Sequence, residues 1–79
     1  MPHSDFSKWW VRAQKEASTH LSDGYRYLLV WKELSCGIIN LYHSKSCTRL
    51  SYKVRKDGYS IFRNGVKVAE RNEQQHVEV

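Results

Sequence analysis

The chain has few of the features that mark small secreted or membrane proteins. Its two cysteines cannot form the framework of several disulfides that stabilises many small secreted domains. No apolar run approaches the roughly 20 residues of a membrane-spanning helix, the first residues are too polar for a signal peptide, and no Asn-x-Ser/Thr site is present. We therefore expect an intracellular, cytoplasmic protein with reduced thiols and no membrane partner.

Catalytic motifs are also absent. A Gly-rich phosphate-binding loop is missing, because the four glycines are scattered and each lies at a predicted turn. The eight acidic residues form no pair at metal-binding spacing and no D/E-x-K segment. We therefore expect no enzymatic activity, no catalytic residues and no cofactor.

The nearest approach to a metal site is the set Cys36, His43 and Cys47. A structural zinc site takes four ligands, usually in closely spaced pairs, whereas these residues are separated by six and three others and lack an obvious fourth ligand. A catalytic Cys-His pair would also need an orienting group, which the neighbouring sequence does not supply. We therefore expect that Cys36 and Cys47 bind no metal and take part in no catalysis. The alternative is a zinc site in which a distant histidine supplies the fourth ligand.

An amphipathic helix is predicted over about residues 5–20. Ser4 is a suitable N-cap, and Asp5 suits the positive end of the helix dipole. At about 100° per residue, the apolar side chains fall within one stripe of about 120°: Phe6, Trp9, Trp10, Ala13, Ala17 and Leu21. We expect the stripe, and the Trp9-Trp10 pair in particular, to cover one face of a thin sheet.

The rest of the chain reads as strands separated by turns. Strands are predicted at about 25–34, 38–43, 48–56, 59–63 and 66–70, followed by a polar tail at 71–79. The first of these is apolar on both of its alternating sides, which predicts a central strand covered on both faces. The fold class is therefore a single α+β domain, with the helix packed on a four- to five-stranded antiparallel meander.

Two dipeptides predict the register of the last three strands. Asp57-Gly58 and Asn64-Gly65 suit two-residue hairpin loops, whose central residues need positive φ. If each is such a loop, Val54, Ile61 and Val68 form one row facing the core. Counting along the same loops puts Phe62 opposite both Lys53 and Lys67 on the other face. A slip of one residue would instead turn Phe62 toward the helix.

The positive charge is concentrated in this meander. The net charge is +5, and the segment 43–71 holds eight of the 13 cations but only two of the eight acids. Such a cluster is typical of a surface that meets a polyanion, although it would also arise if a small sheet filled its wet face with Lys and Arg.

These patterns favour a small non-enzymatic nucleic-acid-binding domain, with single strands preferred. The predicted contacts are four cations that hold phosphates and one ring that stacks on bases: Arg49, Lys53, Arg55, Lys67 and Phe62. The alternative is an inhibitor or adaptor, such as a phage-type anti-defence protein, whose basic face meets an acidic protein surface. The unpaired edges of a small sheet also allow a strand-paired homodimer.

Part of the chain resembles a known family. The segments 6–10, 13–17 and 27–33 (FSKWW, AQKEA and YLLVWKE) are similar to the helix-then-strand segment of small phage-type PD-(D/E)xK nucleases of the Holliday-junction-resolvase class. The resemblance covers about the first 34 residues and implies a DNA-associated piece of fold. Because that family's metal-binding carboxylates and catalytic lysine precede this segment, where only five residues stand here, the resemblance assigns nuclease chemistry to no residue.

Overall fold

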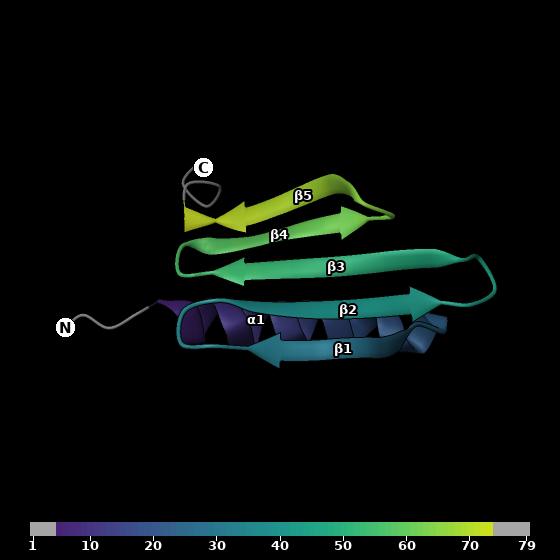
Figure 1. Cartoon of the computed structure of the whole chain (residues 1–79), viewed down its shortest axis with the longest axis horizontal. Coiled ribbons are helices and arrows are strands. Elements are labelled where there is room, and N and C mark those ends of the chain that lie inside the picture. Colours follow the sequence, from purple (N-terminus) through teal and green to yellow (C-terminus); the bar gives the residue numbers. More distant parts are fainter. Residues whose placement is uncertain (1–4, 74–79) are drawn as a thin grey trace.

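One helix packed on a five-stranded sheet makes up the computed structural model, which describes residues 5–73 (Figure 1). The elements are α1 (Phe6–Thr19), a 3-10 turn η1 (His20–Asp23), β1 (Arg26–Lys32), β2 (Gly37–His43), β3 (Thr48–Arg55), β4 (Gly58–Arg63) and β5 (Val66–Asn72). The strands pair antiparallel in the order β1-β2-β3-β4-β5, so the predicted α+β meander is confirmed.

The helix forms where the apolar stripe predicts it. Its buried residues are spaced three or four apart: Phe6, Trp9, Ala13 and Ala17. Asp5 occupies the N-cap position without a side-chain capping bond, and the predicted cap Ser4 lies outside the described residues. The described part of the chain, residues 5–73, has no helix with the length and apolarity to cross a membrane.

The core lies between α1 and the middle of the sheet. The helix packs mainly across β3, with further contacts to β2 and β4. Trp9 is 1% exposed and meets Tyr59 edge-on, with the ring centroids 6.1 Å apart. Trp10 covers Gly37, where an added Cβ would lie 2.4 Å from the indole ring. The prediction that both Trp rings cover the sheet is therefore confirmed.

The predicted pairing of β3 with β4 is wrong by two residues. Val54 pairs with Tyr59 rather than Ile61, and Lys53 pairs with Ser60 rather than Phe62. The cause is the turn, which is made by Lys56 and Asp57, while Gly58 already pairs with Arg55 at a φ of 149°. Because the error is an even number of residues, Val54 and Ile61 still face the core, and Phe62 still faces away from it.

The Asn64-Gly65 turn forms as predicted, but the row that follows it does not. Both turn residues have positive φ, Arg63 pairs with Val66, and Phe62 pairs with Lys67. A bulge then shifts the register, so that Ala69 rather than Val68 opposes Ile61. Val68 is consequently 53% exposed and does not belong to the core row.

The predicted central position of the first strand is also wrong. In a meander the first strand is an edge, and α1 packs on β2, β3 and β4 instead. All seven residues of β1 are exposed, including the apolar segment 27–31. At the other edge, β5 continues to Asn72, two residues further than predicted, and 74–79 of the predicted polar tail lie outside the described residues.

Candidate functional site

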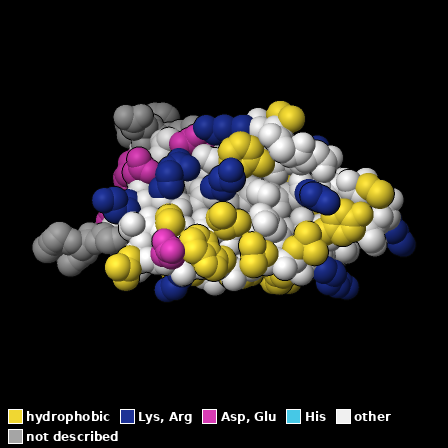
Figure 2. Space-filling model, in the orientation of Figure 1, with side chains coloured by type: hydrophobic (Ala, Val, Ile, Leu, Met, Phe, Trp, Pro, Cys, Tyr) yellow, Lys and Arg dark blue, Asp and Glu magenta, His cyan; other side chains and the backbone are white. Residues whose placement is uncertain are grey.

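The sheet has one face that α1 does not cover, which we call the open face. Residues that pair across antiparallel strands share a face, so the ladders assign each side chain. Figure 2 shows the open face, with hydrophobic side chains gathered along β1 and β2 and cationic side chains mostly over the strands beyond them. This division brings rings, hydroxyls and positive charges onto one exposed surface.

All five residues predicted to form the binding site lie on the open face. Arg49, Lys53 and Arg55 alternate along β3, while Phe62 and Lys67 form a cross-strand pair between β4 and β5. Phe62 is half-buried, and the Lys53 ammonium lies 4.9 Å from the centre of its ring. A cation at that distance is attracted by the ring quadrupole, so the aromatic face and the charge form one unit.

Two of the predicted phosphate-binding cations are engaged by an acid. The Arg55 Nη2 lies 3.1 Å from Glu70 Oε2, and Lys67 forms an ion pair with the same carboxylate. The hydrogen bond from Lys67 holds the pKa of Glu70 below its usual range. The hydrogen bond from Asn72 and the positive charge of Arg55 lower this pKa as well. Glu70 therefore stays ionised and offsets part of the positive charge of the open face.

The other two cations, Arg49 and Lys53, make no ion pair with any residue of the described range. Arg49 lines a shallow hollow of about 490 Å³ together with Ser51, Asn64 and Gly65. The Arg49 backbone N–H donates to Asn64 Oδ1 at 2.8 Å, and the Asn64 N–H donates to the Arg49 carbonyl at 2.9 Å. These bonds fix the β4–β5 turn beside Arg49, where a guanidinium and a hydroxyl face one concave site.

Sequence reasoning missed two further rings on the open face. Tyr42 pairs with Arg49, and Trp31 pairs with Ile38, so both rings lie on the same side as Phe62. The side-chain hydrogen bond to Cys47 raises the pKa of Tyr42 above its usual value of 10.0. The period-two alternation of 38–43 was the signal that could have placed Tyr42 beside the cations.

The residues considered for a metal site are not brought together. Cys36 immediately precedes β2, and Cys47 lies in the turn between β2 and β3, so the two thiols stand beyond opposite ends of β2. The His43 ring nitrogen Nδ1 is 2.7 Å from the Ser46 hydroxyl. Within residues 5–73, no three potential His, Cys, Asp or Glu ligands cluster.

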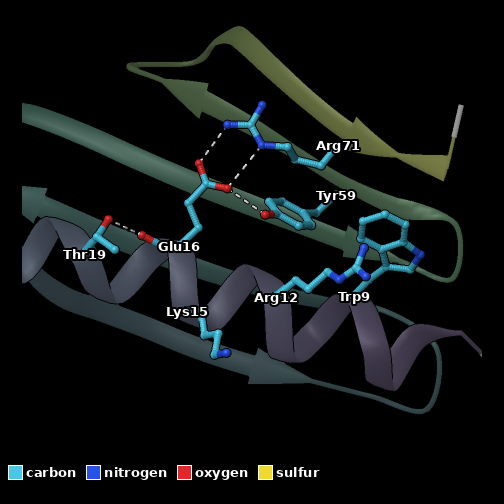
Figure 3. A pocket seen from close by; sticks show the side chains of 7 residues that line it. All are labelled: Trp9, Arg12, Lys15, Glu16, Thr19, Tyr59 and Arg71. Atoms are coloured by element: carbon cyan, nitrogen blue, oxygen red, sulfur yellow. Dashed lines mark hydrogen bonds and ion pairs between the residues drawn. The ribbon is translucent and has the colours of Figure 1, made fainter. Parts of the chain in front are cut away.

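A second hollow, of about 410 Å³, lies on the helix side of the sheet between α1, β4 and β5. Figure 3 shows the Glu16 carboxylate at its centre, accepting a 2.6 Å hydrogen bond from the Tyr59 hydroxyl and pairing with Arg71 at 3.0 Å. Burial and this bond to Glu16 raise the pKa of Tyr59 to about 12. The polar groups thus satisfy one another and join the helix to β4 and β5.

Comparison with known protein families, with curated proteins and with solved structures finds no match to this chain. Its function is therefore inferred from its own surface chemistry.

Proposed function

We propose that the chain binds single-stranded nucleic acid on the open face and acts without catalysis. The observation that carries this proposal is the pairing of an accessible ring with cations that have no acidic partner in the described range. Lys53 lies over Phe62, and Arg49 stands beside Tyr42 on the same surface. Rings that stack on bases and cations that hold phosphates are the two components of sequence-tolerant single-strand binding.

The cations supply affinity through the phosphates. A Lys or Arg that neutralises a phosphate releases a condensed counterion, so binding weakens as the salt concentration rises. Arg49 and Lys53 are available for such contacts, whereas Arg55 and Lys67 would first have to leave Glu70. The binding site proposed for phosphates is therefore centred on β3, with the hollow beside Arg49 at one end.

The shape of the surface favours single strands over duplexes. An open sheet presents its rings broadside, and bases can stack on them only when they are not already stacked in a double helix. The helix α1 packs on the other face of the sheet, so it does not belong to the surface that carries these rings and could not bring them to a major groove. Phe62 and Tyr42 would therefore each receive one base of an extended strand.

A salt titration of binding to a labelled single-stranded oligonucleotide tests the proposal, with Lys53→Ala as the informative variant. Loss of one phosphate contact should weaken binding and reduce the slope of log affinity against log salt by about one. Lys15→Ala is the matched control, because Lys15 is an exposed lysine on α1, outside the open face. The control should keep the wild-type slope.

Two results would contradict the proposal. Absence of measurable binding at about 50 mM salt would remove it outright. Equal losses in Lys53→Ala and Lys15→Ala would show that net charge, rather than the open face, determines affinity. No cleavage product is expected when the same oligonucleotide is incubated with magnesium or manganese.

The contribution of the ring is tested by Phe62→Leu. Leucine keeps much of the apolar bulk but cannot stack, so affinity should fall by about 1 to 3 kcal/mol, while the salt slope stays unchanged. The melting temperature is measured in parallel because Phe62 is half-buried. An unchanged affinity, in a variant that melts like the wild type, would rule out stacking on this ring.

A protein partner is the second candidate function. The open face exposes residue types that dominate protein-binding hot spots, among them Trp31, Tyr42 and Arg49. On this proposal the chain is an inhibitor or adaptor, and its basic surface meets an acidic surface of another protein. Two results together would favour this function. The wild-type chain would bind no oligonucleotide, and it would retain a protein partner after nuclease digestion that the Arg49→Glu variant fails to bind.

A further inference from the structure

The edge strand β1 is apolar along its whole middle. Its residues 27–31, Tyr-Leu-Leu-Val-Trp, are each between 44% and 60% exposed. Strand edges are usually protected by charges or bulges, because their free N–H and C=O groups can pair with another chain. The other edge, β5, has such protection in Lys67, Glu70, Arg71 and the bulge at Val68. The strand β1 has charges only at its ends, at Arg26 and Lys32, and its bulge at Leu28 leaves residues 29–32 as a regular run without such protection.

The hydrogen-bonding groups of β1 alternate between β2 and solvent. The Glu33 N–H donates to the Cys36 carbonyl at 2.8 Å, so Glu33 directs its backbone groups toward β2. In an antiparallel ladder this direction alternates, and Val30 and Lys32 therefore direct their N–H and C=O groups away from the sheet. An added strand would therefore find outward-facing backbone partners at Val30 and Lys32.

We propose that this added strand is β1 of a second copy of the chain, paired antiparallel about a two-fold axis at Val30. A two-fold axis perpendicular to the sheet leaves both helices on the same side of the joined sheet. Residues that pair across the axis must then lie on the same face of the sheet in both copies. Val30 then meets its own copy on the helix side, and Leu29 meets Trp31 of the second copy on the open face. Both contacts bury apolar side chains that are about half exposed in the single chain.

The same register matches charges at the ends of the strand. Leu28 is the extra residue of the β1 bulge, so beyond it the ladder continues with Tyr27 and Arg26. Counting outward from Val30 places Tyr27 opposite Lys32 and Arg26 opposite Glu33 of the second copy. The two-fold axis makes each contact twice. Opposite charges therefore close both ends of an apolar centre, whereas pairing without the bulge would leave these charges unmatched.

The resulting dimer joins two five-stranded sheets edge to edge, with both helices on one side and both open faces on the other. This inference does not depend on nucleic-acid binding, because it rests on β1 alone. If both proposals hold, the two open faces form one continuous surface.

The dimer is tested by sedimentation of the wild type and of two matched variants, Val30→Lys and Val68→Lys. The two valines are 50% and 53% exposed on the two edge strands, so each single chain should tolerate lysine equally. The wild type should reach twice the 9.4 kDa mass of the chain as its concentration rises. Val30→Lys should stay at the single-chain mass because two lysines would meet at the axis, whereas Val68→Lys should dimerise like the wild type.

The register is tested by charge reversal. Glu33→Arg should weaken dimerisation about tenfold or more, because it places arginine opposite Arg26, and the double variant Arg26→Glu/Glu33→Arg should restore it. Circular dichroism and melting temperature confirm that each variant is folded.

Three outcomes would overturn the inference. The wild type could stay at the single-chain mass up to about 1 mM, or Val30→Lys could dimerise as well as Val68→Lys. The wild type could also form large assemblies of mixed size, which would indicate indiscriminate edge pairing. These sedimentation experiments are carried out without nucleic acid. A failure of the dimer proposal is therefore distinct from a failure of the proposed function, which the oligonucleotide titration tests.

Discussion

At the scale of single residues, Glu70 is the residue that sets the charge of the open face. Its carboxylate pairs with both Arg55 and Lys67, and it also lies within hydrogen-bonding distance of Ser60 and Asn72. A polyanion that approaches the open face meets this negative charge among the cations. On the proposed function, Glu70 would oppose phosphate binding, while it holds the side chains of Arg55 and Lys67 in place.

Glu70→Gln should raise the affinity for a single-stranded oligonucleotide. Removal of the charge frees Lys67 and leaves Arg55 with its 3.5 Å ion pair to the exposed Asp57, so the salt slope should increase by about one to two, one for each new phosphate contact. The matched control is Asp23→Asn, which makes the same charge change in η1, outside the open face. An equal gain in the two variants would mean that Arg55 and Lys67 do not contact the ligand.

At the scale of elements, the helix and the five strands were predictable because each has a local signal. The spacing of Phe6, Trp9, Ala13 and Ala17 defines one helix face, and period-two alternation with turn residues defines the strands. The five predicted binding residues also lie on the predicted face, since the error in the β3–β4 turn was even and kept the side chains of β3 and β4 on their faces. A one-residue error would have turned Phe62 inward.

The remaining differences depend on interactions beyond the local sequence. The bulge that exposes Val68 leaves no residue-type signal, because valine suits a regular strand equally well. The pairing of Arg55 with Glu70 spans two strands and could be placed only once both registers were known. The apolar character of 25–34 predicted a covered central strand, and this prediction is wrong because the strand order puts that segment at an exposed edge.

At the scale of the whole molecule, hydroxyls within the core join the layers. The Tyr59 hydroxyl donates to Glu16 of α1, and the Tyr52 hydroxyl lies 2.9 Å from a ring nitrogen of His20. Burial raises the pKa of both tyrosines above the usual value of 10.0, that of Tyr59 to about 12. The folded state therefore binds the two phenolic protons more tightly than the unfolded chain does.

The stability contributed by Tyr59 should be lost at alkaline pH. Below pH 10 both states keep the proton and the contribution is complete, whereas between pH 10 and about 12 only the unfolded chain releases it. The free-energy advantage of the wild type over Tyr59→Phe should thus be constant at neutral pH and shrink by about 1.4 kcal/mol per pH unit above 10. Denaturant unfolding at several pH values measures it, and a pH-independent difference would contradict the assignment.

The unbroken order of the strands has a kinetic consequence. Each strand finds its partner in the next segment of the chain, across turns of only a few residues, so every pairing closes a short loop. Sheets assembled from distant segments are slow because long loops must close before any contact forms, and this chain avoids that delay. Assembly can follow the order of synthesis, hairpin after hairpin, and refolding should be fast for a protein so rich in strands.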